Sequence, residues 1–175
     1  MWRPSEARAH VQATLERVGG AAVITLAFAA KVAAGPRRVW RALTDPTLVA
    51  RWRPDFVAFH PPAPASLGEP GCVARFRCRL RGFPVVGELR VLRARQGAAL
   101  QTRVRLGLFA FDESFSLRRE PGAGTTRIGL VLSLGNQAAV VSGSLDRFAV
   151  RRLASELAEQ TLSALGAVCE EGDAG

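Results

Sequence analysis

The stretch 39-VWRALTDPTLVARWRP-54 decides the fold, because it contains the signals for two consecutive short helices. Asp45 followed by Pro46 predicts a helix start, since an Asp side chain accepts hydrogen bonds from the first free amides and Pro already has a helical φ. Gly35-Pro36 marks the start of the preceding helix, and Pro54 ends the second one. The apolar residues of both helices, including two Trp, are expected on one side. The arginines are expected to face solvent: Arg41, Arg51 and Arg53.

Strands are predicted on both sides of this helix pair. Residues 21–31 are rich in β-branched and aromatic side chains and predict a first strand. After the helices, alternating runs separated by Gly- and Pro-containing turns predict six more strands. These are Phe56–His60, Cys72–Leu80, Val85–Leu92, Leu100–Leu106, Phe109–Leu117 and Thr126–Leu134. Because the turns are mostly short, consecutive strands are expected to pair as an antiparallel meander.

Helices are predicted at the two ends of the chain. From Leu145 to Val168, apolar residues recur every three or four positions, which predicts a long amphipathic helix. Residues 5–18 carry Val11, Leu15 and Val18 at helical spacing and predict a modest helix that ends at Gly19-Gly20. The expected organisation is therefore an N-terminal amphipathic helix (1–20), a single domain (21–170) and a polar tail (171–175).

The parity of the strands separates an apolar face from a basic one, since successive side chains of a strand point to opposite faces. In residues 73–79 the basic face is Arg75, Arg77 and Arg79, and the apolar face is Ala74, Phe76 and Cys78. Residues 100–106 and 126–134 repeat this alternation. We expect the apolar faces to be covered by the long C-terminal helix and the arginines to form a solvated outer face.

The positive charge brings polyanions into consideration. Formal net charge is +9, and Lys31 is the only lysine, a bias towards Arg that GC-rich codons also produce. Nucleic-acid binding favours aromatic residues interleaved with the basic ones, whereas the aromatic residues here share the opposite face. We therefore expect no nucleic-acid partner, and we leave open a peripheral contact with an anionic membrane.

Other motifs exclude several kinds of site. Cys72, Cys78 and Cys169 lack the paired spacing of a zinc ribbon and fit a reducing, cytoplasmic environment. The chain contains no HExxH, GxSxG, Walker or GxGxxG motif, so neither a metal nor another cofactor is expected. The apolar run 21–30 is too short to span a bilayer and lies too far into the chain for an ordinary signal peptide.

Two titratable residues are candidates for chemistry. Glu113 has the parity of the inward-facing Phe111 and Phe115, and an unpaired carboxylate at such a position is costly. It is either a ligand contact or general acid/base, or a carboxylate that pairs with an arginine or reaches solvent. His60 ends a short strand beside the Pro-rich segment 61–71, where it is either an acid/base under a lid or a surface residue.

The order of strand, two short helices, six-stranded meander and long helix resembles the START and birch-pollen-allergen-like (SRPBCC) superfamily, particularly its bacterial polyketide cyclase/dehydrase-like branch. GPRRVWRALTDPTLVARW (35–52) is similar to the family's Pro-x-x-Val-Trp-x-x-Leu-x-Asp-Pro pattern with its final Trp, although a paired aromatic is frequent where this chain has Trp-Arg. ESFSLRREPGAGTTRIGLVLSL (113–134) and the helix at 145–168 resemble the family's penultimate hairpin and gripping helix. The resemblance covers about residues 21–170.

The resemblance implies an α+β helix-grip fold. In this fold a curved antiparallel sheet, here of about seven strands, wraps around the long C-terminal helix, with the two short helices after strand one and an apolar cavity between sheet and helix. The predicted N-terminal helix lies outside the family pattern.

Three functions are compatible with such a cavity. The first is binding or transport of a hydrophobic small molecule such as a lipid, polyketide or isoprenoid. The second is a polyketide cyclase/dehydratase-type enzyme in which Glu113 and His60 move protons. The third is an interaction module without a ligand. The predicted ligand-binding residues are Trp52, Phe76, Cys78, Thr102, Val104, Phe111, Phe115, Leu130, Phe148 and Arg152.

Overall fold

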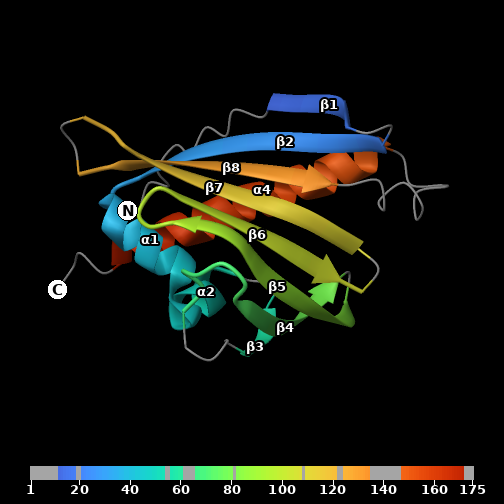
Figure 1. Ribbon diagram of the computed structural model, residues 1–175, viewed down its shortest axis with the longest axis horizontal. Coiled ribbons are helices and arrows are strands. Elements are labelled where there is room, and N and C mark those ends of the chain that lie inside the picture. The colour runs from blue at the N-terminus through green and yellow to red at the C-terminus, as the bar shows by residue number, and fades with distance from the viewer. Residues whose placement is uncertain are drawn as a thin grey trace, which may run out of the picture.

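A single curved antiparallel sheet forms the framework of the protein (Figure 1). The computed structural model describes residues 12–18, 21–53, 56–60, 66–80, 82–107, 109–121, 124–134 and 147–171. In this part of the chain the sheet has eight strands in the order β1-β2-β8-β7-β6-β5-β4-β3. The strands are β1 (Gln12–Val18), β2 (Ala21–Val32), β3 (Phe56–His60), β4 (Val73–Leu80), β5 (Phe83–Arg95), β6 (Ala99–Leu106), β7 (Phe109–Arg119) and β8 (Thr126–Leu134).

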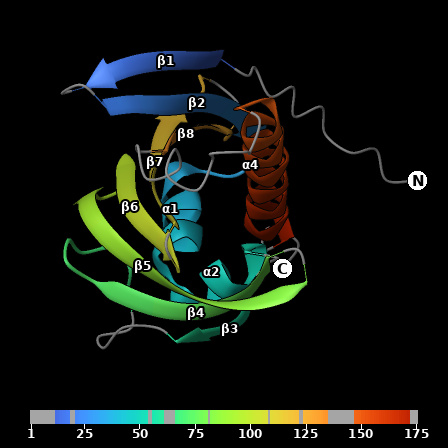
Figure 2. The same ribbon diagram turned by 90° about the vertical axis from the view of Figure 1, so that its right-hand side faces the viewer.

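In the described part of the chain, three helices lie on the concave side of this sheet (Figure 2). They are α1 (Pro36–Thr44), α2 (Pro46–Trp52) and α4 (Arg147–Glu170). The long helix α4 packs on β2, β8 and both short helices, so that it closes the open side of the curve. The predicted helix-grip fold is therefore confirmed, and the two short helices follow strand β2.

The junction of the short helices forms as the sequence predicts. The Asp45 carboxylate accepts hydrogen bonds from the Thr47 amide at 2.9 Å and the Thr47 hydroxyl at 2.6 Å, which caps α2. Pro46 occupies the first turn, where its missing amide hydrogen costs no helical bond. At the other end of α2, the Trp52 indole Nε1 donates to the Ala42 carbonyl oxygen at 2.8 Å and ties the two helices together.

The two faces of the sheet follow the predicted parity. On β4 the exposed residues are Arg75, Arg77 and Arg79, and the buried ones are Ala74, Phe76 and Cys78. On β6 and β8 the same alternation leaves Arg103, Arg105 and Arg127 exposed. The buried side chains meet those of the helices in one core, which includes Leu26, Phe28, Val39, Leu130, Leu162 and Leu165.

The predicted N-terminal helix is wrong for residues Gln12–Val18, which form strand β1. Val18 pairs with Ala21 and Gln12 with Ala27, so β1 adds an eighth strand beside β2. Two glycines between two runs are a hairpin signal as well as a helix stop, and a short helix without tertiary packing is only marginally stable, whereas a strand can pair with the backbone of β2. Residues 5–11 of the predicted helix lie outside the described part of the chain.

Several elements extend beyond their predicted ends, among them one strand and the long helix. Strand β5 spans Phe83–Arg95 instead of Val85–Leu92, and its pairing with β6 shifts register between Val91 and Arg93. Helix α4 continues to Glu170 instead of Val168, and its buried residues include Ala158, Thr161, Leu162, Leu165 and Cys169, whereas Leu157 and Ala164 are half-buried. Residues 145 and 146 of the predicted helix lie outside the described residues.

Candidate functional site

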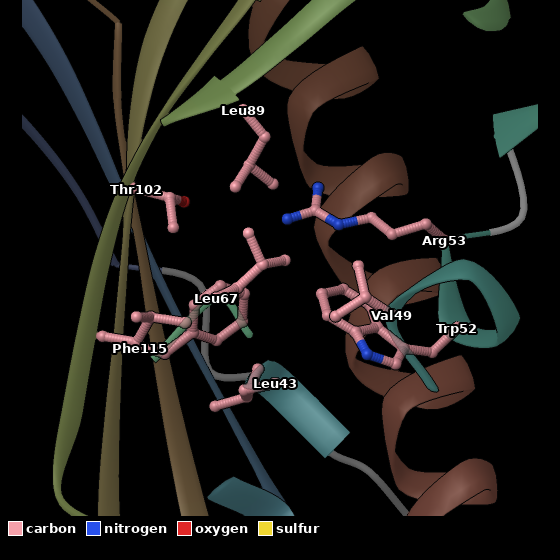
Figure 3. Close-up of a pocket in the computed structure, with 9 residues that line it drawn as sticks. Leu43, Val49, Trp52, Arg53, Leu67, Leu89, Thr102 and Phe115 are labelled. Carbon is pink, nitrogen blue, oxygen red and sulfur yellow. The ribbon is translucent and has the colours of Figure 1, made fainter. Parts of the chain in front are cut away.

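A small cavity lies between the short helices and the middle of the sheet (Figure 3). Its apolar walls are Leu43, Val49, Leu67, Leu89, Leu100 and Phe115. Trp52 adds an indole that meets the Phe115 ring edge-on at 6.1 Å between centroids. The polar lining consists of Thr102 from β6 and Arg53, which follows directly after α2.

The cavity is much smaller than the hollow expected from the sequence. The volume of the cavity is about 10 Å³, which is room for roughly one water molecule. Leu67 is one of the side chains that fill this space: it is 1% exposed, and its amide donates to the Thr44 carbonyl oxygen at 2.8 Å. Leu67 belongs to the connection between β3 and β4, so a loop residue occupies space that the sheet and helices leave open.

A buried ion pair forms the polar side of the cavity. The Arg53 guanidinium donates through Nη1 to Glu113 Oε1 at 2.8 Å and through Nη2 to Glu113 Oε2. The Thr102 hydroxyl donates to Glu113 Oε2 at 3.1 Å. The side chains are 10% exposed for Arg53 and 4% for Glu113, so both charges are removed from water and compensate each other. Arg53 thus turns inward, and the prediction that it faces solvent is wrong.

The orientation of Arg53 has two visible causes. Its guanidinium stacks over the Trp52 indole, with Cζ 4.6 Å from the ring centroid, and also lies 5.6 Å from the centroid of Phe56. The carboxylate of Glu113 then captures both terminal nitrogens. Two signals in the sequence point to this contact. The inward parity of Glu113 places a carboxylate in the interior, where it needs a positively charged partner, and Arg53 directly follows the buried Trp52.

The third nitrogen of the Arg53 guanidinium, Nε, takes no part in the hydrogen bonds to Glu113. Within the described part of the chain, Arg53 Nε is buried and has no hydrogen-bond partner. Figure 3 shows the side chain reaching from the end of α2, between Leu89 and Val49, towards Thr102. The donor therefore lies on a side chain that borders the cavity.

The predicted site residues fall into separate groups. Trp52, Thr102 and Phe115 line the cavity, and Glu113 adjoins it through Arg53 and Thr102. The others inside the protein are core residues outside this lining: Phe76, Cys78, Val104 and Leu130 are buried, and Phe111 is half-buried.

The remaining predicted site residues are not brought to the cavity. His60 is exposed at the end of β3, opposite Arg75, and is therefore separate from Glu113. Arg152 is an exposed residue of α4 whose Nε donates to Glu156 at 2.9 Å, so its predicted role in the lining is wrong. Helical periodicity alone did not show which face of this part of α4 turns away from the sheet. The side chain of Phe148 lies outside the described residues.

Three further features concern metal ligands, the Cys169 thiol and membrane spanning. No group of three or more His, Cys, Asp or Glu side chains among them is arranged to hold a metal ion. Burial raises the pKa of the Cys169 thiol to about 11, so the thiol is protonated at neutral pH and acts as a small apolar residue. In the same part of the chain, no helix has both the length and the apolar character needed to cross a membrane.

Comparison with solved structures shows the same fold in several proteins. A START superfamily protein from Mycobacterium smegmatis superposes with a TM-score of 0.67 at 16% identity, covering 84% of this chain and 97% of that one. Ara h 8.0201 gives 0.63 at 12% identity, with 83% and 97% covered. A protein from Arthrobacter aurescens gives 0.64 at 16% identity, with 90% and 91% covered. At these identities the similarity establishes the fold alone.

Sequence comparison assigns a family. Residues 23–170 match the family model described as polyketide cyclase / dehydrase and lipid transport. Comparison with curated proteins found no match. The match begins within β2 and ends at the last residue of α4, so it includes every element that builds the cavity.

Proposed function

Because the chain belongs to the polyketide cyclase / dehydrase and lipid transport family, we propose that it binds a hydrophobic small molecule, such as a lipid, a polyketide or an isoprenoid, in the cavity behind α2. The observation that carries this proposal is the lining: seven of the nine residues are apolar or aromatic, and the polar groups are confined to one corner. A pocket of this composition suits a ligand whose surface is mostly hydrocarbon.

The hydrogen bonds among Arg53, Thr102 and Glu113 support binding better than catalysis. A general acid or base needs an oxygen free to exchange a proton with the substrate. Both oxygens of Glu113 accept hydrogen bonds from Arg53, and one also accepts from Thr102. His60, the other predicted catalytic residue, is exposed on β3. The cyclase/dehydratase alternative would therefore have to break the buried ion pair before any proton moved.

A ligand larger than a water molecule must displace part of the lining, and Leu67 is the side chain best placed to move. It is carried by the β3–β4 connection, and its single described tether to the short helices is the backbone bond to Thr44. The other apolar lining residues belong to regular helices and strands. We propose that Leu67 occupies the ligand's place in the empty protein and leaves it on binding.

The variant Leu67→Ala tests this function. Removing the side chain should destabilise the fold by about 2–5 kcal/mol and at the same time enlarge the cavity. Binding of the neutral dye Nile red, followed by fluorescence, should tighten at least tenfold relative to the unmodified chain. Native mass spectrometry of the purified protein should show a co-purified hydrophobic molecule retained more fully by the variant.

Leu165→Ala is the matched control, because Leu165 is 0% exposed but lies on α4 and outside the cavity lining. It should lose a similar amount of stability without gaining affinity for the dye. If neither the unmodified chain nor Leu67→Ala binds any hydrophobic probe, or if both alanine variants gain equally, the proposal is wrong.

A further inference from the structure

We infer that the unpartnered Nε–H of Arg53 is the polar anchor of the site, and that the ligand it selects is a hydrophobic molecule with an uncharged acceptor oxygen, such as a ketone, ester or alcohol. The inference rests on the proposed function, because it assigns a chemical class to the ligand of the same cavity. It starts from one atom: a buried donor on a side chain that is nine-tenths buried and lines the cavity.

A buried donor without an acceptor is unfavourable, and folded proteins leave few of them. The arrangement around Arg53 shows why this donor stays free. Glu113 satisfies both terminal nitrogens, and the neighbouring Trp52 and Phe56 rings offer faces to the guanidinium but no oxygen. Arg53 lines the cavity, which has room for roughly one water. An acceptor oxygen on a ligand would replace such a water.

The charge balance of the corner selects against an anionic ligand. The positive charge of Arg53 is already compensated by Glu113. A carboxylate placed at Nε would bring a second buried anion against one cation, and both repulsion and desolvation oppose this. A carbonyl or hydroxyl oxygen accepts the same hydrogen bond without adding charge. The site should therefore discriminate a neutral oxygenated molecule from the corresponding acid.

The composition of the cavity lining favours a ligand with one polar group and an otherwise apolar surface. Apart from Arg53 and from Thr102, whose hydroxyl donates to Glu113, every lining residue is Leu, Val, Trp or Phe. Additional polar groups on the ligand would be buried without partners, which is costly. The expected ligand carries its oxygen at one end and hydrocarbon elsewhere.

The test compares three small probes of nearly the same shape: acetophenone (ketone), α-methylstyrene (the same skeleton with a methylene in place of the oxygen) and benzoate (anion). Each is titrated into the ¹⁵N-labelled full chain and into Leu67→Ala, and affinities are measured from backbone amide shifts. The side-chain Nε–Hε signal of Arg53, identified by its loss in Arg53→Lys, reports directly on the donor.

We expect acetophenone to bind about tenfold more tightly than α-methylstyrene, the order of one charge-assisted hydrogen bond, and to move the Hε signal downfield. Benzoate should bind more weakly than acetophenone by at least the same factor. In Arg53→Lys, which keeps a positive charge for Glu113 but has no Nε–H, the preference for the ketone should disappear. Arg51→Lys, on the exposed side of α2, is the matched control and should keep the preference.

The outcomes separate this inference from the proposed function. If α-methylstyrene and acetophenone bind equally and the Hε signal does not respond, the anchor is wrong while hydrophobic binding stands. If benzoate binds best, the site is an anion site and the inference is overturned. If no probe binds either protein, the cavity is not a ligand site, and both proposals fail.

Discussion

At the scale of single residues, the pair Arg53–Glu113 explains how a basic chain holds a carboxylate in its interior. Charge pairing in a buried place is a poor source of net stability, because desolvation of both groups offsets their attraction. Removing only one partner is strongly unfavourable, since the other charge then stays buried alone. The pair is therefore better understood as a fixed structural unit than as two independent polar residues.

The first prediction follows from that coupling. Arg53→Met and Glu113→Met should each lower the free energy of unfolding by about 3–5 kcal/mol, whereas the double variant should lose less than either single one. Urea denaturation of all four proteins measures the coupling. The exposed pair Arg103–Asp112, joined by hydrogen bonds of 2.7 and 2.9 Å, provides the matched cycle. Its coupling should stay below about 1 kcal/mol, and equal coupling in both cycles would contradict the argument.

The second prediction concerns the cap of α2. Hydrogen bonds from Thr47 hold the pKa of Asp45 below its ordinary value of 3.8. Because the native pKa is depressed, the stabilisation is complete above the unfolded pKa and is lost as the pH falls through the native one. Asp45→Ala should cost about 1 kcal/mol at pH 7 and should lose less stability than the unmodified chain on acidification below pH 4.

Thermal unfolding between pH 7 and pH 2.5 measures this difference. Asp45→Asn keeps a capping oxygen without a titrating group, so it should remain close to the unmodified chain at pH 7 and resemble Asp45→Ala in its flatter acid limb. A parallel acid limb in all three proteins would exclude the cap as a contributor.

At the scale of elements, most of the architecture could be predicted from the sequence. The helix starts at Gly35-Pro36 and Asp45-Pro46 are local signals, and strand parity depends only on alternation. The run 12–18 was misassigned because its spacing fits a helix, whereas its actual conformation depends on pairing with β2. Backbone pairing with a distant or neighbouring strand is a tertiary effect that a seven-residue window does not contain.

The sequence alone also did not predict which arginine pairs with Glu113. Three arginines lie in or near α2 in sequence, and which of them pairs with Glu113 depends on the Trp52 ring and on the exact end of the helix. The sequence also did not predict the volume of the cavity, because this volume depends in part on the packing of Leu67, a residue of the irregular β3–β4 connection. Composition predicts that an interior is apolar; it does not predict how completely that interior is filled.

The third prediction is a contrast between two glycines of the sheet. A Cβ atom at Gly87 would lie 2.3 Å from Phe76 Cζ and 2.9 Å from the Arg105 carbonyl oxygen. Gly87→Ala should therefore force the buried ring and the adjoining strand to move, and should cost about 1–3 kcal/mol. At Gly129 the close atom is the Ser116 hydroxyl oxygen at 2.6 Å, on an exposed side chain that can rotate away.

Gly129→Ala is thus the matched control and should change stability by less than about 0.5 kcal/mol. Urea midpoints of the two variants, measured beside the unmodified chain, decide the comparison. Similar losses at both positions would mean that intrinsic strand propensity, rather than the space beneath Phe76, governs these sites.

At the scale of the whole molecule, the convex face of the sheet is basic while the helices occupy the other side (Figure 2). The described carboxylates of this face are engaged, Glu88 with Arg90 and Asp112 with Arg103. Other exposed arginines extend over β4 and β6, and the exposed Val86 lies opposite Arg77. We propose that this positive surface, with its few apolar side chains, contacts an anionic bilayer.

The fourth prediction tests that surface. The chain should co-sediment with vesicles containing phosphatidylglycerol at low ionic strength, and should be released by about 0.5 M salt, which shortens the screening length to a few ångströms. Substituting Arg75, Arg77 and Arg79 together by Gln should weaken the association, because the three side chains are exposed and occupy one strand. Equal retention on pure phosphatidylcholine vesicles would show that charge is not responsible.

Strand β1 has a consequence for self-association. It covers the backbone of β2 along Ala21–Ala27, a stretch that is uncharged, free of proline and rich in β-branched residues. Segments of that composition, when left as a bare sheet edge, template pairing with other chains and begin fibrillar aggregates. Strand β1 therefore protects this edge of the sheet, and a shortened chain starting at residue 21 should aggregate.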